Sequence, residues 1–164
     1  MKIQIRKWVF ETNSSSIHAI AISTKKPNLE NIEMVYFARD EFGWEQRTYD
    51  TTQKKANYLY EVILDCFYEQ HFEIEKAKKK IKEYLKEYNI VCDFEISEDY
   101  FAWYVDHWSE LKYFLDYILK SKENLINYLF WEESVIYTWH DNEEEFMCYI
   151  PWETEDRKVF VKWN

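Results

Sequence analysis

The chain has 164 residues, of which 47% are hydrophobic and 20% aromatic, and its formal net charge is −10. So much apolar material excludes a generally disordered chain, and this length fits one domain with a sizeable core. Because phosphate binding depends on lysine and arginine, the excess of acids argues against direct nucleic acid binding as the main role. A protein that is acidic and rich in aromatic side chains is instead suited to bind a basic surface, such as that of a nucleic-acid-binding protein.

Strands and helices are both predicted in the first half of the chain. Alternating and apolar runs predict three strands, and residues 39–52, which hold the only glycine, are predicted to form a loop. From Gln53 the apolar residues recur at helical spacing, which predicts two helices. The predicted strands are 2–10, 17–23 and 34–37, and the predicted helices are 52–70 and 73–88.

The second half continues this mixture. Ser109 and Ser121 are suitable N-caps for two further helices. Strands are predicted at 90–96, 100–107, 135–137, 146–150 and 158–163. Because the order is not a regular βαβ alternation, the sequence predicts an α+β fold: one domain over residues 1–164, with a mixed or antiparallel sheet and about four helices.

The three cysteines and the N-terminal residues indicate the cellular compartment in which we expect the protein. Cys66, Cys92 and Cys148 are widely spaced and form no C-x-x-C motif, which disfavours a disulfide framework or a zinc knuckle. The N-terminus lacks the apolar segment of a signal peptide, and no run approaches the ~18 apolar residues that span a bilayer. We therefore expect a cytoplasmic protein with no membrane partner.

The predicted helix at 73–88 carries a run of lysines on the face opposite its apolar stripe. With Glu75 and Glu83 nearby, this run is typical of a solvated face, and the alternative is a basic ridge for nucleic acid. The lysines are Lys76, Lys78, Lys79, Lys80 and Lys82.

A polar turn, Asn13-Ser14-Ser15-Ser16-Ile17-His18, lies between the first two predicted strands. A serine hydroxyl near His18, with backbone N–H groups around it, would suit a nucleophile or an anion-binding site. The same side chains would equally satisfy their own backbone in a purely structural turn. A nucleophile elbow or a P-loop would require glycines that are absent here.

Two later acid-containing pairs could complete a catalytic site with this turn. Asp106-His107 and Asp141-Asn142 supply an acid, a base and amide donors, so their convergence with His18 would make a hydrolase-like site. No pair of these residues has the i, i+4 spacing of zinc-binding helices, and we predict neither a metal nor another cofactor.

The last part of the chain is rich in acids and tryptophans. Glu143, Glu144 and Glu145 form a cluster that is either a solvated loop or a negatively charged binding face. Trp139 and Trp152 lie near these charges in the sequence, and exposed rings beside charges are typical anchors of protein interfaces. With Asn13 and Asn142, these residues are the candidate binding residues.

The stretch Val9-Phe10-Glu11-Thr12-Asn13-Ser14-Ser15-Ser16-Ile17-His18 resembles a signature at the start of uncharacterised proteins encoded by bacteriophages and prophages of low-GC bacteria. Tyr104-Val105-Asp106-His107-Trp108-Ser109 and segments between Glu123 and Asn142 are similar to that family too. The family has no established reaction, so the resemblance implies a phage-type origin and a bacterial host. Trp139-His140 stand where relatives often have a small residue and an amide, and a ring there would close a pocket that relatives keep open.

These observations lead to two main hypotheses. The first is a phage or prophage accessory protein that binds a host protein, as an acidic, anti-CRISPR-like inhibitor of a nucleic-acid-handling defence system. The second is a small hydrolase or nucleotide-modifying enzyme that uses the polar turn with the Asp-His and Asp-Asn pairs. A third possibility, an assembly component of the phage particle, would self-associate into rings or tight homo-oligomers.

Overall fold

The computed structural model describes residues 16–42, 47–67, 70–96, 111–140 and 152–162. Within them the fold is α+β, as predicted, with four helices, a four-stranded antiparallel sheet and a two-stranded parallel sheet. None of the described helices is both long and apolar enough to span a membrane. The predicted strands at 2–10, 100–107 and 146–150 lie outside the described residues.

The antiparallel sheet is built around its first strand. The strand order is β3 (Arg47–Tyr49), β5 (Val135–His140), β1 (Ser16–Ser23) and β6 (Arg157–Lys162). Because side chains alternate along a strand, Ile20 and Ile22 of β1 enter the main core, whereas Ile17 and Ala19 pack with Trp139 in a small second cluster. β1 is therefore buried on both faces.

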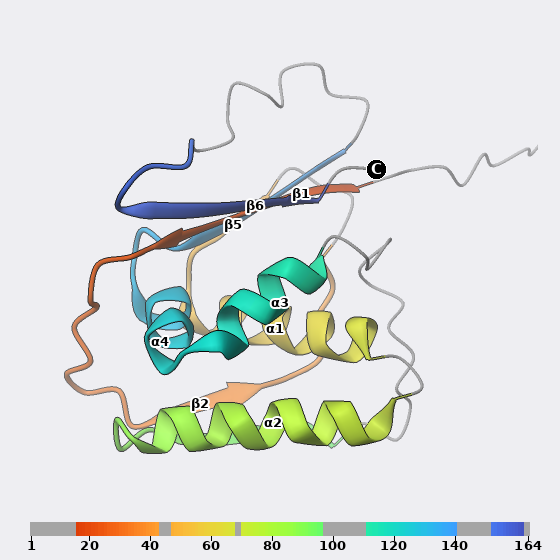
Figure 1. Cartoon of the computed structure of the whole chain (residues 1–164), viewed down its shortest axis with the longest axis vertical. Coiled ribbons are helices and arrows are strands. Elements are labelled where there is room, and N and C mark those ends of the chain that lie inside the picture. The colour runs from red at the N-terminus through yellow and green to blue at the C-terminus, as the bar shows by residue number, and fades with distance from the viewer. Residues whose placement is uncertain (1–15, 43–46, 68–69, 97–110, 141–151, 163–164) are drawn as a thin grey trace, which may run out of the picture.

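The helices separate the two sheets (Figure 1). α1 (Thr52–Cys66), α3 (Leu111–Lys120) and α4 (Lys122–Phe130) lie beneath the four-stranded sheet, and α2 (His71–Lys86) lies at the opposite end of the molecule. Every residue of α1 from Lys55 to Leu64 is buried, so α1 is the central helix of the core. The Ser121 hydroxyl accepts a hydrogen bond from the backbone N–H of Asn124 and caps α4, as predicted.

The parallel pair consists of β2 (Met34–Phe37) and β4 (Val91–Phe94). Alternation places Val35, Phe37 and Phe94 in the core and leaves Met34, Tyr36 and Val91 on the outer face. α1 covers the free edge of β2. The Gln53 side chain donates a hydrogen bond to the Tyr36 carbonyl (2.6 Å), and the Asn57 side chain accepts one from the Ala38 N–H (3.1 Å). α2 packs against β4.

Most of the predicted elements in the described residues are confirmed, and their ends are corrected by a few residues. The strand at 17–23 begins at Ser16, and the helix predicted over 52–70 ends at Cys66. The prediction of a continuous loop over 39–52 is wrong at Arg47–Tyr49, which forms β3. A strand of three residues is too short to show a sequence period, and its pairing with β5 defines it.

Candidate functional site

The polar turn contributes one residue to the core. His18 is 0% exposed, and its Nδ1 lies 2.9 Å from the hydroxyl of Tyr58 on α1. Burial raises the pKa of Tyr58 well above its usual value, so this phenol is neutral at physiological pH. A general base has to reach its substrate. His18 instead joins the sheet to α1 from within the core.

Most of the other candidate catalytic residues lie outside the residues that the structure describes. Ser16 is the first residue of β1, whereas Asn13, Ser14 and Ser15 lie outside the described residues. Asp106, His107, Asp141 and Asn142 lie outside them as well, as do the acids Glu143, Glu144 and Glu145. The convergence of these groups with the polar turn stays a prediction. Among the described residues, no cluster of three or more His, Cys, Asp or Glu could hold a metal ion.

The two candidate tryptophans differ in environment. Trp139 is 3% exposed and stacks on Tyr137, with ring centroids 5.4 Å apart. The prediction that Trp139 is an exposed interface anchor is therefore wrong. It pairs in register with Ile17 and joins the cluster on the outer face of the sheet, where alternation along β5 places it. Trp152, by contrast, is 78% exposed.

Trp152 begins a short exposed segment ahead of β6, which we call the Trp152 surface and define as residues 152–156. It holds the indole and three carboxylates, and it contains no basic residue. Lys158 pairs with Glu153, and Lys25 lies 3.8 Å from Asp156, so two of the acids are partly balanced. Glu155 forms no ion pair with a described residue. The Trp152 surface thus keeps a net negative charge beside an exposed ring.

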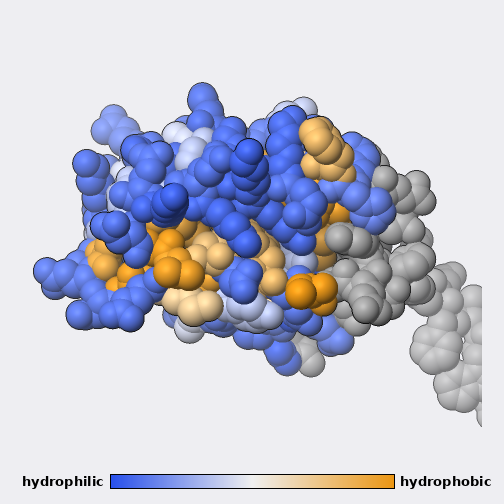
Figure 2. Space-filling view, turned by 90° about the horizontal axis from the view of Figure 1, so that it is seen from below, coloured by the Kyte–Doolittle hydropathy of each residue, from blue (hydrophilic) through white to orange (hydrophobic). Residues whose placement is uncertain are grey.

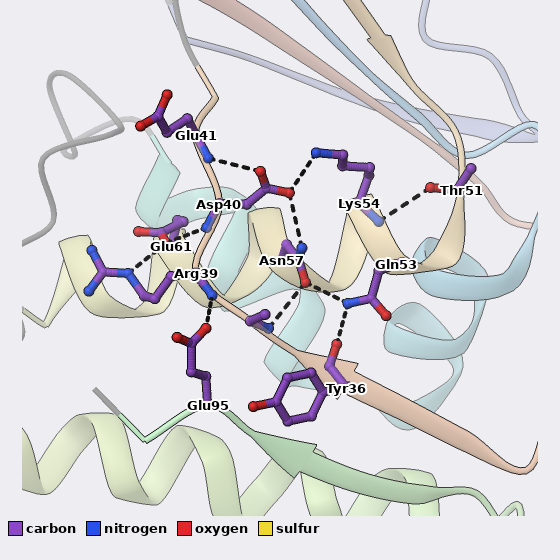
Figure 3. Close-up of polar contacts among 11 residues, drawn as sticks. Tyr36, Arg39, Asp40, Glu41, Thr51, Gln53, Lys54, Asn57, Glu61 and Glu95 are labelled. Carbon is purple, nitrogen blue, oxygen red and sulfur yellow. Dashed lines mark hydrogen bonds and ion pairs between the residues drawn. The ribbon is translucent and has the colours of Figure 1, made fainter. Parts of the chain in front are cut away.

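The structure also contains a polar network that sequence analysis did not predict (Figure 3). The network lies where β2 ends, between the segment 38–41 and α1. Asn57 accepts the Ala38 N–H at 3.1 Å and donates to Asp40 at 3.0 Å, and Lys54 donates to the same carboxylate at 2.7 Å. One turn further along α1, Glu61 accepts Nε of Arg39 at 2.7 Å and the Asp40 N–H at 3.0 Å.

Burial and hydrogen bonding compete in setting the charge of this network. Burial favours a higher pKa for Asp40, but hydrogen bonds from Asn57 and Lys54 outweigh it, so the pKa is lowered. At Glu61 burial prevails over the Arg39 ion pair and raises the pKa. Because the charges of the network mostly bond one another, the arrangement fixes segment 38–41 on α1. The sequence signal was the polar stripe at 53, 54, 57 and 61 on the predicted helix.

A third feature is the lower surface of the molecule, formed by α2 and the parallel pair. Met34 and Val91 are paired in register and are 57% and 61% exposed, and Ile96, just beyond β4, is 93% exposed. Figure 2 views the molecule from below and shows apolar residues gathered beside a strongly hydrophilic region. Asp93, which pairs in register with Tyr36, is exposed on the same face, and we call the exposed side chains of Met34, Tyr36, Val91 and Asp93 the sheet face.

A groove of about 490 Å³ runs along α2 beside the end of β4. Four lysines of α2 line it together with neighbouring acids, Phe94 and Ile96. Most of the α2 lysines have acidic neighbours, as expected for a solvated face: Lys78 lies 3.1 Å from Glu75 and Lys82 lies 3.6 Å from Asp93. Lys80 and Lys86 have no carboxylate partner among the described residues. The lining lysines are Lys78, Lys79, Lys82 and Lys86.

Comparison of this chain with protein families, with curated proteins and with solved structures found no significant match.

Proposed function

We propose that this chain is a phage- or prophage-encoded accessory protein that binds a host protein with a basic, nucleic-acid-binding surface, as an acidic inhibitor of a defence system of the anti-CRISPR kind. The observation that carries the proposal is the Trp152 surface. It combines an indole that is 78% exposed with Glu153, Glu155 and Asp156. Tryptophan is among the residues that most often dominate the binding energy of protein interfaces.

In such a contact the indole would supply most of the binding free energy, and the carboxylates would act on the association rate and on the choice of partner. Burying the exposed part of an indole contributes on the order of 3–4 kcal/mol before the costs of association are subtracted. The three carboxylates would speed encounter with a basic patch and disfavour acidic partners. The interaction would therefore weaken as salt screens these charges.

The environment of His18 also favours binding over catalysis. The enzymatic alternative uses His18 as a base beside the triple serine, yet the imidazole is 0% exposed and bonded to Tyr58 in the core. A protein-binding role needs no accessible histidine. We therefore place the function on the surface of the molecule.

A pull-down from lysate of a bacterial host tests the proposal. The full chain serves as bait at low and at high salt, beside the Trp152→Ala and Glu155→Lys variants. Tyr113→Ala is the matched control, because Tyr113 is a similarly exposed ring, 74%, on α3. We expect one specific partner that is lost with Trp152→Ala, weakened by Glu155→Lys or by high salt, and kept with Tyr113→Ala. Equal recovery with all baits at both salt concentrations would refute the proposal.

A further inference from the structure

We propose that a second groove, between α2 and α3, binds a small organic phosphate: a phosphate monoester with an apolar body. This groove has a volume of about 410 Å³ and is lined by residues of both helices. Its size lies within the range of about 300–1,000 Å³ that is usual for small-molecule sites. The proposal concerns a ligand rather than a host protein, and it does not depend on the proposed function.

The apolar part of the lining is fixed by the core. Ala77 of α2 is 4% exposed, and both Phe67, which follows α1, and Leu119 of α3 pack against the main core. The Tyr84 hydroxyl of α2 donates a hydrogen bond to the Leu119 carbonyl at 3.1 Å, which joins the two helices at this point. The apolar body of a ligand would therefore contact a surface that is already formed.

The charges around this lining have a positive balance. Four lysines and two acids line the groove, whereas four lysines and four acids line the groove beside β4. An excess of two positive charges contrasts with the net charge of −10 of the whole chain. A phosphate monoester carries about two negative charges at neutral pH, so it matches this excess. The lining lysines are Lys76, Lys80, Lys112 and Lys120.

Two of these lysines are available to an anion. Lys80 and Lys120 have no carboxylate partner among the described residues. The Lys80 ammonium lies 5.7 Å from the centroid of the Tyr84 ring, and this ring is itself held by its bond to α3. A lysine placed in this way is a positioned point charge for a phosphate group.

The other two lysines are paired with the acids of the groove. Lys76 lies 3.2 Å from Glu73, and the side chains of both are partly exposed. Lys112 lies 3.6 Å from Asp116, and both are more than half exposed. Because exposed ion pairs are weak, a dianion can share these lysines. The two acids would repel further phosphates, so the groove favours a single phosphate group over a nucleic acid strand.

Titration of the full chain with phenyl phosphate, followed in ¹⁵N–¹H correlation spectra, tests the site. Phenyl phosphate joins a dianionic phosphate to an apolar ring. Benzenesulfonate has the ring with a single charge, and inorganic phosphate has the charge without the ring. We expect saturable shifts at the backbone amides of the groove residues, and tighter binding of phenyl phosphate than of either control compound.

Two double variants of equal charge locate the binding. Lys80→Gln with Lys120→Gln removes the two unpaired lysines, whereas Lys79→Gln with Lys86→Gln removes two lysines of the groove beside β4. We expect the first variant to bind phenyl phosphate about tenfold more weakly and the second to change its affinity by less than about twofold. Asp116→Asn, which removes an acid from the groove, should strengthen binding. None of these positions is buried, and circular dichroism verifies that each variant folds.

Several results would overturn the proposal. Absence of saturable shifts is one, and equal losses of affinity in the two double variants is another. Benzenesulfonate binding as tightly as phenyl phosphate would show that the groove does not select a dianion. Preferential binding of a short single-stranded oligonucleotide across both grooves would replace the proposed ligand with a nucleic acid. Each of these results leaves the proposed function intact, because the Trp152 surface lies beside the four-stranded sheet, away from α2 (Figure 1).

Discussion

The Tyr58 hydroxyl lies 2.9 Å from Nδ1 of His18, and both side chains are 0% exposed. The bond connects the central strand of the antiparallel sheet to the central helix of the core. Tyr58 also packs edge-on against Phe42 and Phe114, so its ring is held from several sides. A buried polar pair of this kind stabilises the fold only while both members are present.

Tyr58→Phe removes the hydroxyl and leaves His18 without this partner while the ring packing is kept. We expect the free energy of unfolding to fall by about 1–3 kcal/mol, the usual cost of losing one partner of a buried hydrogen bond. Urea denaturation measures the change. Tyr113→Phe, at a position that is 74% exposed, should leave stability unaltered. Equal effects of the two substitutions would contradict a role of this bond in the core.

Lys55 makes the free energy of unfolding depend on pH in the alkaline range. Its Nζ donates to the carbonyls of Trp131 at 2.8 Å and Ser134 at 3.0 Å, and burial lowers its pKa from 10.5 to about 8. The unfolded chain keeps this proton to higher pH than the folded chain, so the unfolded state binds more protons between the two pKa values. The contribution of Lys55 to the free energy of unfolding therefore rises with pH through that interval.

The Lys55→Met variant isolates this contribution from other groups that titrate at alkaline pH. We expect the stability of the natural chain, relative to that of the variant, to increase by on the order of 1–2 kcal/mol between about pH 7.5 and about pH 9.5. Urea midpoints at the two pH values give the comparison. Parallel pH profiles for the two proteins would contradict the assignment.

Asn57→Ala tests the polar network at the end of β2. The substitution leaves the Ala38 N–H without its acceptor and removes one donor from Asp40. We expect a loss of about 1–3 kcal/mol in the free energy of unfolding. Gln53→Ala, on the same helix face, removes the side-chain hydrogen bonds to the Tyr36 carbonyl and to Asn57 Oδ1 but leaves the Ala38 N–H and Asp40 bonded to Asn57, so it should cost less, about 0.5–1 kcal/mol. If the two substitutions lower the free energy of unfolding by similar amounts, the hydrogen bonds of Asn57 to Ala38 and Asp40 do not make the contribution to stability that we expect.

Asn89 lies in the turn that brings β4 back beside α2. Its φ is 59°, in the left-handed region, and the N–H of Ile90 returns to the Leu85 carbonyl at 3.1 Å to complete the end of the helix. We expect Asn89→Ala to lower the free energy of unfolding by about 1 kcal/mol, because a Cβ without a compensating polar group disfavours this conformation. Asn89→Gly should be neutral or stabilising. Thermal unfolding of the two variants measures this difference, and equal melting temperatures of Asn89→Ala and Asn89→Gly would contradict the prediction.

Several elements could be predicted from the sequence because one strong local signal defines each of them. The apolar spacing of Ile74, Ala77, Ile81 and Leu85 predicts α2, and all four residues are buried. Ser121 followed by an apolar stripe predicts α4. The parallel pairing of β2 with β4 had no such signal, since register between distant segments depends on tertiary packing.

The functional residues were harder to predict for a related reason. Residue type alone does not distinguish Trp139 from Trp152, which are 3% and 78% exposed. Their environments depend on which face of β5 points into a cluster and on where the chain turns before β6. His18 posed the same problem, because a histidine after three serines suits either a catalytic turn or the end of a buried strand. Only its packing against Tyr58 distinguishes the two.

The placement of β1 in the sheet has a consequence for how the protein forms in the cell. β1 lies between β5 and β6, and the backbone N–H of its Ser23 reaches the Ser134 hydroxyl across 111 residues of chain. During synthesis this apolar strand emerges long before either neighbour has left the ribosome, and closing so large a loop is slow. Nascent chains that stall before Val135 would expose both edges of β1 and would be prone to aggregation.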